Sequence, residues 1–506
     1  MSRAATGKVK VSQGKRGLIL LFMEAMINRG ATRPEMDMDK SRLEMLKEHH
    51  EKTLWVYWTL ILLGFWLLFT PLTFNFDVGV VSPSGGRSVW LSLENRILAL
   101  RVSDFVSGLL LIFFGFKSLR ANHPVSLWIC CFVGVWLSFA PVLFWAPTAV
   151  SYYNDTFIGM IVMALTVLVP GMPNMVRYME MGTSLPRGWT YNPSSWPQRW
   201  IMIVLGFAGF LVSRYLAAFQ LGYIDSVWDP FFGESTKLVL NSKMSHSLPI
   251  SDAGLGSLAY TFEFLMGYMG SPSRWRTMPW MVTFFGILVI PLGLVHIFLV
   301  ISQPVIVGFW CTFCLLAALI MLPMLPLEVD EVIAMGQFIK RKVNEGEGFW
   351  KIFWKGGGEE EFNIDEERKS EAPDLYDFSQ KPGEIIAASF WGMSFPWSLV
   401  ATTLFGVITT LLPSFFEVPK TYMNTLQVAG LLTITFSVIA MGEPFRILRF
   451  TNFIIAAAII ASSFIISGVS GALPWLAGCL ALLIILSSYP RGEIHHRFGS
   501  WDRFIR

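Results

Sequence analysis

Charged residues are scarce in this 506-residue sequence. Asp, Glu, Lys and Arg make up 15% of it, whereas soluble domains carry about 25%. A chain with so little charge, and 53% hydrophobic, is not expected to be soluble. Its formal net charge is only +3, so nothing points to nucleic-acid binding. The N-terminal stretch is polar and basic, with no apolar run ahead of a small-residue cleavage site, so we expect no cleavable signal peptide.

Cysteine is also scarce. The five cysteines are too few for a disulfide scaffold in a chain of this length. Cys130, Cys131 and Cys479 lie inside apolar segments, where we expect them to pack as small buried hydrophobic residues. The other two, Cys311 and Cys314, form a C-x-x-C pair at the start of an apolar segment. Most of what the sequence indicates about function depends on this pair.

What the sequence has in abundance is apolar stretches of about 20 residues, which is the length of a membrane-spanning helix. We therefore expect an all-α polytopic membrane protein with about twelve transmembrane helices in three four-helix blocks. The expected spans are 54–75, 98–116, 125–145, 155–172, 200–219, 253–270, 279–301, 305–325, 391–413, 422–440, 452–467 and 471–489.

The distribution of Lys and Arg predicts the orientation. Most of these residues lie in the N-terminal and C-terminal tails and in alternate loops, whereas the opposite loops carry almost none. The positive-inside rule then places both termini in the cytoplasm. Loop 76–97, with Arg87 and Arg96, fits this assignment least well. The same assignment places segment 220–252 and the Cys311 end of its helix on the outer, oxidising side of a bacterial inner membrane, which the chain would cross many times.

The first and third blocks resemble each other. SDFVSGLLLIFFG (103–115) parallels TLQVAGLLTITFS (425–437), and we interpret this as a duplication. A Ser-Phe-Pro-Trp run at 394–397 opens the third block, and both blocks resemble the SPW-repeat membrane modules. The expected domains are a cytoplasmic segment 1–53, an SPW-like module 54–175, a middle bundle 198–326, a cytoplasmic polar insert 327–388, a second SPW-like module 389–490 and a cytoplasmic tail 491–506.

The polar insert has two halves of different composition. Its first half, FIKRKVNEGEGFWKIFWKGG, mixes aromatic with basic residues and suits a segment lying on the inner membrane surface. Its second half, EEEFNIDEERKSEAPDLYD, is acidic. This half is either a solvated linker or a binding site for a protein partner.

The C-x-x-C pair has three interpretations. Cys311 follows Pro304 and Gly308 at the expected start of a helix, where free backbone N–H groups and the helix dipole stabilise a thiolate. Cys314 lies one turn further on the same face, so the two thiols can form a redox-active disulfide. A structural, inert pair is the second interpretation. A metal site would need about two more soft ligands, and only His246 and His296 lie nearby, so we expect no metal.

The middle block resembles the vitamin K epoxide reductase family. The segments LVLNSKMSHSLPISDAGLGSLAY (238–260) and WCTFC (310–314) carry the resemblance, which covers residues 198–326. It implies a four-helix membrane thiol oxidoreductase that passes electrons from a reduced thiol partner through a dithiol to a quinone. By position, Cys311 and Cys314 correspond to the redox pair. Ser242 or Ser247 corresponds to the loop Ser that hydrogen-bonds the quinone.

The sequence departs from that family at one point. Family members that relay electrons from a partner carry a second cysteine pair in the outer loop, but residues 220–253 contain no Cys. Thiol exchange requires contact between a thiolate and a disulfide sulfur. A thiol-donor protein would therefore have to reach Cys311 or Cys314 directly.

Four further residues of the middle block are candidates for binding the quinone. Asp252 lies where a helix starts and is expected to be its N-cap, with quinone or partner binding as the alternative. Tyr260 is expected to hydrogen-bond within the bundle. Glu263 falls near the bilayer midplane, where a carboxyl group is costly and marks a functional site. His296 is either a hydrogen-bonded core residue or a neighbour of Glu263 and the quinone.

Three polar residues lie near the ends of other expected spans. Asp104 and Asp155 are expected to cap helices, and Arg214 is expected to extend its guanidinium group to the membrane surface.

Two functions from different classes are compatible with the sequence. One is a quinone-coupled thiol–disulfide oxidoreductase. The other is a non-catalytic scaffold or accessory subunit of a larger membrane complex, with a degenerate reductase module in its middle. The retained C-x-x-C favours the enzyme, whereas the missing loop cysteines and the flanking blocks favour the scaffold. Transport is a weaker third class, since the two similar blocks have the same expected orientation and are not inverted repeats.

Overall fold

The computed structural model describes residues 44, 47–74, 76–120, 123–167, 183–359, 381–469 and 471–505. Most of the N-terminal segment and nearly all of the acidic half of the polar insert lie outside the described residues. The chain divides into two compact units, Met1–Glu51 and Lys52–Arg506. The few described residues of the first unit are helical. The described helices that are long and apolar enough to cross a membrane all belong to the second unit.

The described part of the second unit is built from helices and contains no strand, only two isolated β-bridges. Ten of its helical segments are long and apolar enough to cross a membrane, which confirms an all-α polytopic membrane protein. They are α3 (Leu54–Thr73), α4 (Leu93–Ser118), α5 (Pro124–Leu143), α6 (Ala149–Val167), α8 (Trp196–Gln220), α12 (Pro279–Ser302) with η2 (Gln303–Val307), α13 (Thr312–Asn344), α16 (Trp397–Leu411) with η4 (Leu412–Phe415), α17 (Lys420–Met441), and η5 (Glu443–Phe450) with α18 (Thr451–Ile465).

Two shorter helices occupy the remaining expected spans. These are α10 (Asp252–Tyr268), with 17 residues, and α19 (Leu473–Ser488), with 16 residues. Neither meets the length of a full span by itself, so the number of twelve spans and the side of the termini stay predictions.

The first block packs its four helices in a closed cycle, in which α3 contacts α4 and α6, and α5 contacts α4 and α6. The closest approaches are made by glycines. A Cβ atom on Gly64 of α3 would lie 2.8 Å from the carbonyl oxygen of Gly108 on α4, and one on Gly134 of α5 would lie 2.8 Å from that of Gly159 on α6. Small residues at such contacts let membrane helices approach backbone to backbone.

The third block repeats this arrangement. Helices α16, α17, α18 and α19 make the same cycle of contacts, and α16 meets α17 at another glycine pair. A Cβ atom on Gly406 would lie 2.9 Å from the carbonyl oxygen of Gly430. Gly430 aligns with Gly108 in the two similar sequence segments. The shared order and the aligned glycine contact support the duplication, while the likeness to SPW modules stays a prediction.

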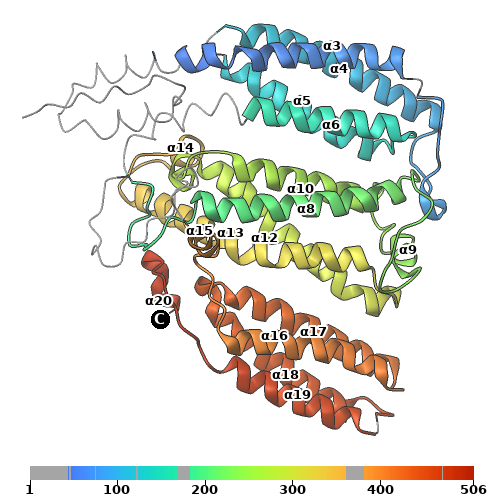
Figure 1. Cartoon of the computed structure of the whole chain (residues 1–506), viewed down its shortest axis with the longest axis vertical. Coiled ribbons are helices and arrows are strands. Elements are labelled where there is room, and N and C mark those ends of the chain that lie inside the picture. The colour runs from blue at the N-terminus through green and yellow to red at the C-terminus, as the bar shows by residue number, and fades with distance from the viewer. Residues whose placement is uncertain are drawn as a thin grey trace, which may run out of the picture. The chain divides into compact units, whose positions relative to one another are not determined.

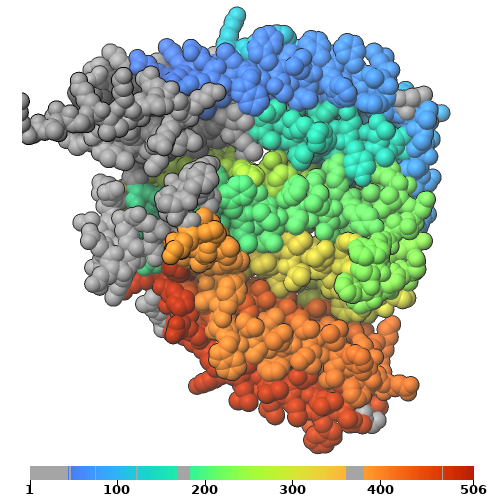
Figure 2. All heavy atoms as spheres, in the orientation of Figure 1, coloured from blue at the N-terminus to red at the C-terminus, as the bar shows by residue number. Residues whose placement is uncertain are grey.

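The middle block consists of α8, α10, α12 and α13. Helix α8 packs on α10 and α13, and α12 closes the cycle by contacting both of them. Its α10 also touches α5 and α6 of the first block, and its α12 and α13 touch α17 of the third. The helices of the middle block therefore lie between the two similar blocks, as the green and yellow segments show in Figure 1 and Figure 2.

Helix α13 does not end where the sequence pattern placed the start of the polar insert. It runs through residue 327 to Asn344 without a break, and its 33 residues give a length of about 50 Å. Glu328, Asp330 and Glu331, which we expected in the insert, are at most 2% exposed. Glu331 forms an ion pair with Arg274 at 2.5 Å, and both side chains are 2% exposed.

Short helices and the C-terminal tail gather at this same end of the middle block (Figure 1). Phe498 of the tail is fully buried against Trp189 and Tyr191. Helix α14 (Phe349–Lys355) exposes Trp350 and Trp354, as a segment on a membrane surface would. The other short helices at this end are α11 (Arg274–Thr277), α15 (Pro382–Ser389) and α20 (Asp502–Ile505).

Asp104 and Asp155 are not helix caps. Both lie inside helices, in α4 and α6, and both are fully buried. The N-cap of α4 is instead Ser92, whose side chain accepts a hydrogen bond from the backbone of Asn95. Hydropathy could not reveal this because a carboxyl group near the end of a span looks the same in sequence whether it faces water or protein.

The arginines of loop 76–97, which fitted the charge rule least well, bind the protein itself. Arg96 donates to the carbonyl oxygens of Phe144 and Trp145. Arg87 donates to the carbonyl oxygen of Leu240 at 3.1 Å. Because these guanidinium groups are committed to internal carbonyls, they say little about which side of the membrane the loop occupies.

The duplicated glycine contacts give a first prediction. Replacing Gly108 or Gly430 by Val inserts a side chain where a carbonyl oxygen already lies within 3 Å, and each change should destabilise its block by about 1–3 kcal/mol. Gly478 on α19 has no atom within 4 Å of a new Cβ, so Gly478→Val is the matched control. Thermal unfolding in detergent should show similar losses for the first two variants and none for the third. A loss in only one of the two blocks would contradict their equivalent packing.

Candidate functional site

The C-x-x-C pair begins helix α13. Cys311 is its N-cap, and Cys311 and Cys314 form a disulfide with a Cα–Cα distance of 5.2 Å. The proximity expected from the spacing is therefore confirmed. The Sγ atom of Cys311 also accepts a hydrogen bond from the backbone N–H of Cys314 at 3.1 Å. An N–H donor at the start of a helix is what stabilises a cysteine thiolate after reduction.

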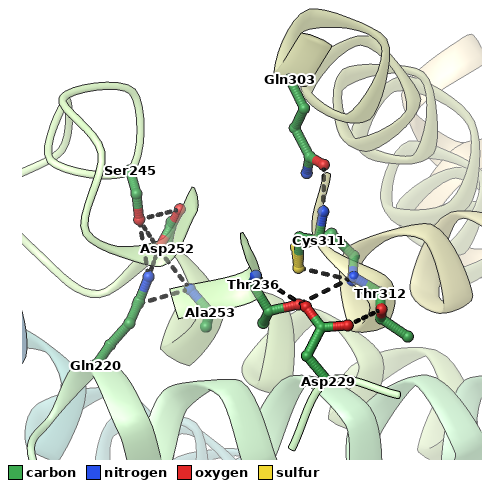
Figure 3. Close-up of a disulfide and its surroundings, with 10 residues drawn as sticks. Gln220, Asp229, Thr236, Ser245, Asp252, Ala253, Gln303, Cys311 and Thr312 are labelled. Atoms are coloured by element: carbon green, nitrogen blue, oxygen red, sulfur yellow. Dashed lines mark hydrogen bonds between the residues drawn. A yellow bond between two sulfur atoms is a disulfide. The ribbon is translucent and has the colours of Figure 1, made fainter. Parts of the chain in front are cut away.

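The chain before the disulfide is shaped by a turn of π-helix. Residues Gln303–Val307 form this turn, and Gly308 follows with φ of 81°, a left-handed conformation that Gly adopts without strain. The side-chain oxygen of Gln303 then accepts the backbone N–H of Cys311 at 3.0 Å (Figure 3). Gln303 thus satisfies an N–H group that the helix itself leaves free.

The two sulfurs differ in their surroundings. Cys311 is fully buried, whereas Cys314 is half-buried. Cys314 and Phe313 pack against a small apolar cluster, and the ring of Phe313 lies 5.1 Å from that of Tyr215. The buried members of this cluster are Leu216, Phe219 and Leu240. Cys314 therefore adjoins apolar and aromatic side chains on α8 and α9 (Ser235–Leu240).

Segment 221–251, here called the cap segment, packs over the start of α13. The hydroxyl of Thr312 donates to the carboxylate of Asp229, and the backbone N–H of Thr312 donates to the hydroxyl of Thr236 at 3.0 Å (Figure 3). Asp229 also accepts the backbone N–H of Thr236 at 2.9 Å. Trp228 and Phe231 remain largely exposed. The cap segment is thus fastened to Thr312, one of the two residues between the cysteines.

Hydrogen bonding gives Asp229 an unusual acidity. Burial acts to raise the pKa of its carboxyl group. Hydrogen bonds from Thr312, Thr236 and the backbone of Phe232 outweigh that effect and lower the pKa from 3.8 to about 2. The ionised form is therefore the form that holds the cap segment.

A second polar group lies beside the apolar cluster. Ser245 is buried, and its hydroxyl donates to the carboxylate of Asp252 at 3.0 Å. The same hydroxyl accepts hydrogen bonds from Gln220 at 2.8 Å and from Arg87 at 2.8 Å. Figure 3 shows Gln220, Ser245 and Asp252 converging next to Ala253. This group joins the end of α8, the cap segment and the start of α10.

The predicted loop serines are not part of this group. Ser242 lies within the cap segment and its hydroxyl accepts the backbone N–H of Ser245 at 3.4 Å, while Ser247 is exposed. Asp252 is not the N-cap of α10 either. Ser251 has that role, since its side chain accepts the backbone N–H of Gly254. Asp252 occupies the first helical position and binds Gln220 and Ser245.

The remaining predicted residues lie deeper in the middle block. Tyr260 is buried, and its hydroxyl donates to the carbonyl oxygen of Ala317, one turn beyond Cys314, at 3.2 Å. Glu263 is fully buried, one turn further along α10. His296 lies on α12 and is half-buried. The structure records no hydrogen bond from His296 to Glu263 among the described residues.

Sequence reasoning missed Asp229, Thr312, Gln220 and Ser245. Gln220 carried a weak signal, because an amide at the end of an apolar span tends to find a polar partner. Asp229 and Ser245 carried none, since each lies in a polar loop among similar residues.

Comparison with known proteins supports the assignment of the middle block. Residues 200–329 match the model of the vitamin K epoxide reductase family. The match includes the disulfide, most of α8, all of α10 and α12, and the first half of α13. No curated protein and no solved structure gives a significant match to the chain.

The cap segment should respond to pH through Asp229. A carboxyl group whose pKa is lowered in the folded protein stabilises the fold above its ordinary pKa of 3.8, and this stabilisation is lost as pH falls toward about 2. We therefore expect constant protection of the backbone amides of the cap segment above about pH 4 and loosening below it. Hydrogen exchange of the cap segment across this pH range measures the effect.

Asp229→Asn is the matching variant, because Asn keeps the size of the side chain but lacks the charge. It should show the loosened level of exchange at every pH. Glu234→Gln, whose side chain is exposed, is the control and should behave as the wild type. Equal protection in Asp229→Asn and the wild type would contradict the role of Asp229.

Proposed function

We propose that this protein is a membrane thiol–disulfide oxidoreductase of the vitamin K epoxide reductase type, in which Cys311 and Cys314 pass electrons to a quinone. The disulfide at the N-terminus of α13, within the segment that matches the family, carries this proposal. In the forward reaction the dithiol loses two electrons and two protons as its S–S bond forms. The quinone takes up two electrons and two protons and becomes a quinol.

The surroundings of the disulfide support a lipid-soluble acceptor. Cys314 is the more exposed sulfur and adjoins Phe313, Tyr215 and Phe219. Apolar and aromatic side chains are the lining that a quinone ring requires. Ser245 and Asp252 lie beside the same cluster and supply polar atoms of the kind that orient such a ring.

The two cysteines would have different roles. The sulfur of Cys311 accepts a backbone N–H group at the start of a helix, which favours its thiolate, and its burial keeps it away from the quinone. Cys314 would be the sulfur next to the quinone. This assignment follows from burial and hydrogen bonding alone.

The thiol donor must approach from the other direction. The cap segment contains no cysteine, and it is tied to Thr312 through Asp229 and Thr236. A reduced partner protein therefore has to displace part of the cap segment before it reaches the disulfide. We propose that such displacement limits the rate with any soluble thioredoxin-like donor.

The second candidate is a non-catalytic scaffold within a larger membrane complex. The observation in its favour is the complete burial of Cys311, next to Thr312, to which the cap segment is hydrogen-bonded. In that case the disulfide would fasten the start of α13 and take no part in electron transfer.

The side of the membrane is part of the proposal. The distribution of Lys and Arg supports an outer location for the Cys311 end of α13 in a bacterial inner membrane. An outer location supplies the oxidising surroundings in which disulfides persist.

Activity of the purified protein separates the two candidates. With dithiothreitol as the reductant and a short-chain quinone as the acceptor, the wild type should reduce the quinone faster than protein-free membranes do. Cys311→Ser and Cys314→Ser should each fall to the protein-free rate, because neither variant can form the disulfide. Cys479→Ser, which removes an exposed free thiol, is the control and should keep the full rate. Full activity in both disulfide variants would favour the scaffold.

Labelling tests the orientation. In a variant that lacks Cys130, Cys131 and Cys479, only the disulfide pair remains to react. A membrane-impermeant maleimide should label intact cells after mild reduction and should not label them before it. If labelling requires access from the cytoplasmic side, the proposed orientation is wrong.

A further inference from the structure

Glu263 is an unusual buried group. It is fully buried, and neither of its carboxyl oxygens has a hydrogen-bond partner among the described residues. Its helix contacts α8 so closely that a Cβ atom on Gly206 would lie 3.5 Å from the Cβ of Glu263. An ionisable residue without a partner inside a membrane bundle is costly, and such residues mark sites that exchange protons or bind ions. Nothing in the packing of the bundle accounts for a carboxyl group here.

Tyr260 lies on the side of Glu263 that is nearer to the disulfide. The two residues are three positions apart on α10 and therefore lie on one face of that helix. The hydroxyl of Tyr260 bonds to the carbonyl oxygen of Ala317. Ala317 in turn lies three residues from Cys314 on α13. A hydroxyl thus stands between the carboxyl group of Glu263 and the redox pair.

Glu328 of α13 lies on the side of Glu263 that is away from the disulfide. Glu328 is buried, and its Oε1 atom has no hydrogen-bond partner among the described residues. Glu263 lies close enough to both Glu328 and Tyr260 to act on each of them electrostatically. Glu331, one turn beyond Glu328, is hydrogen-bonded to Ser194.

The cations at this end of the bundle do not neutralise Glu263. Arg274 pairs with Glu331 and donates to the carbonyl oxygen of Met266. Arg199 donates to the carbonyl oxygens of Gly267 and Met269. These guanidinium groups cap the end of α10, and neither of them hydrogen-bonds the carboxyl group of Glu263.

We propose that Glu263 is a proton-relay residue which, with Tyr260 and Glu328, carries protons between the redox site and the opposite end of the middle block. The inference rests on the proposed quinone chemistry. When the dithiol is oxidised, two protons are released as the S–S bond forms: one passes to the quinone and the other leaves at the Cys311 end. Glu263 supplies one of the two protons that the quinone takes up, by way of the Tyr260 hydroxyl, and regains a proton through Glu328. Protons released and taken up remain equal in number.

Kinetics of matched variants test this relay. Glu263→Gln keeps the shape of the side chain but cannot release a proton, so it should lower kcat for quinone reduction by about tenfold or more, with little change in KM for the quinone. Glu263→Asp retains a carboxyl group and should recover part of the rate. Asp104→Asn is the control, because it removes a buried carboxyl group from the first block and should keep the wild-type rate.

Infrared difference spectroscopy gives a readout that needs no quinone. Reduction of the disulfide by dithiothreitol should change the carbonyl stretch of a protonated carboxyl group. That signal should shift in D₂O and should be missing in Glu263→Gln, but present in Asp104→Asn. If Glu263→Gln does not fold, as judged by its thermal unfolding, Glu263→Asp decides the question, because it should shift the carbonyl stretch only if that signal comes from residue 263.

Failure of the relay and failure of the proposed function give different results. If the wild type does not reduce quinone, the proposed function is overturned. The infrared signal still reports whether the protonation of Glu263 changes when the disulfide is reduced. A wild-type rate in Glu263→Gln, with no carboxyl signal in the wild type, would overturn the relay and leave the proposed function standing.

Discussion

The ion pair between Arg274 and Glu331 is the interaction on which the placement of α13 depends. Both side chains are buried, and Arg274 also holds the carbonyl oxygens at the end of α10. Lipid offers no alternative partner for a charge or a free carbonyl group, and loss of either partner would leave the other charge buried. The pair therefore ties α10, α11 and α13 together. Because α13 is one continuous helix, fixing its second half also fixes Cys311 and Cys314 at its start.

Local signals predicted the disulfide well. Two cysteines three residues apart at a helix start are brought together by helical geometry alone, so no knowledge of the remaining fold was required. The N-cap of α10 was also largely predictable from the local sequence. The run Pro-Ile-Ser-Asp contains two residues that can cap a helix, Ser251 and Asp252. The structure selects Ser251 because Asp252 is drawn away to Ser245 and Gln220. Gln220 lies 32 residues before Asp252, and the path of the cap segment decides that pairing.

Buried charge explains why some boundaries predicted from the sequence were wrong. Glu328, Asp330 and Glu331 resemble the polar end of a membrane span, so the insert was expected to begin at 327. In the structure these groups are buried in the protein, where Glu331 pairs with Arg274 and Ser194, and Asp330 accepts a hydrogen bond from Tyr191. Asp104 and Asp155 were mistaken for caps for the same reason. Hydropathy counts a carboxyl group as exposed, and only the tertiary fold shows that these groups are buried. The number of apolar helices was easier to predict, because it depends on composition over a whole span.

The cap segment and the apolar cluster give the disulfide two unlike faces, which bears on the choice between enzyme and scaffold. On the side of the cap segment, Thr312 is hydrogen-bonded to Asp229 and Thr236. A water-soluble partner must break these hydrogen bonds to reach the disulfide. Beside α8, Cys314 packs with Phe313 against the apolar cluster, and an apolar molecule can replace such contacts without leaving a polar group unsatisfied. A structural disulfide requires no such difference between its faces. A redox centre that takes electrons from a protein and gives them to a lipid-soluble acceptor does require it. The protein donor approaches the S–S bond from water, whereas the acceptor approaches it from the lipid.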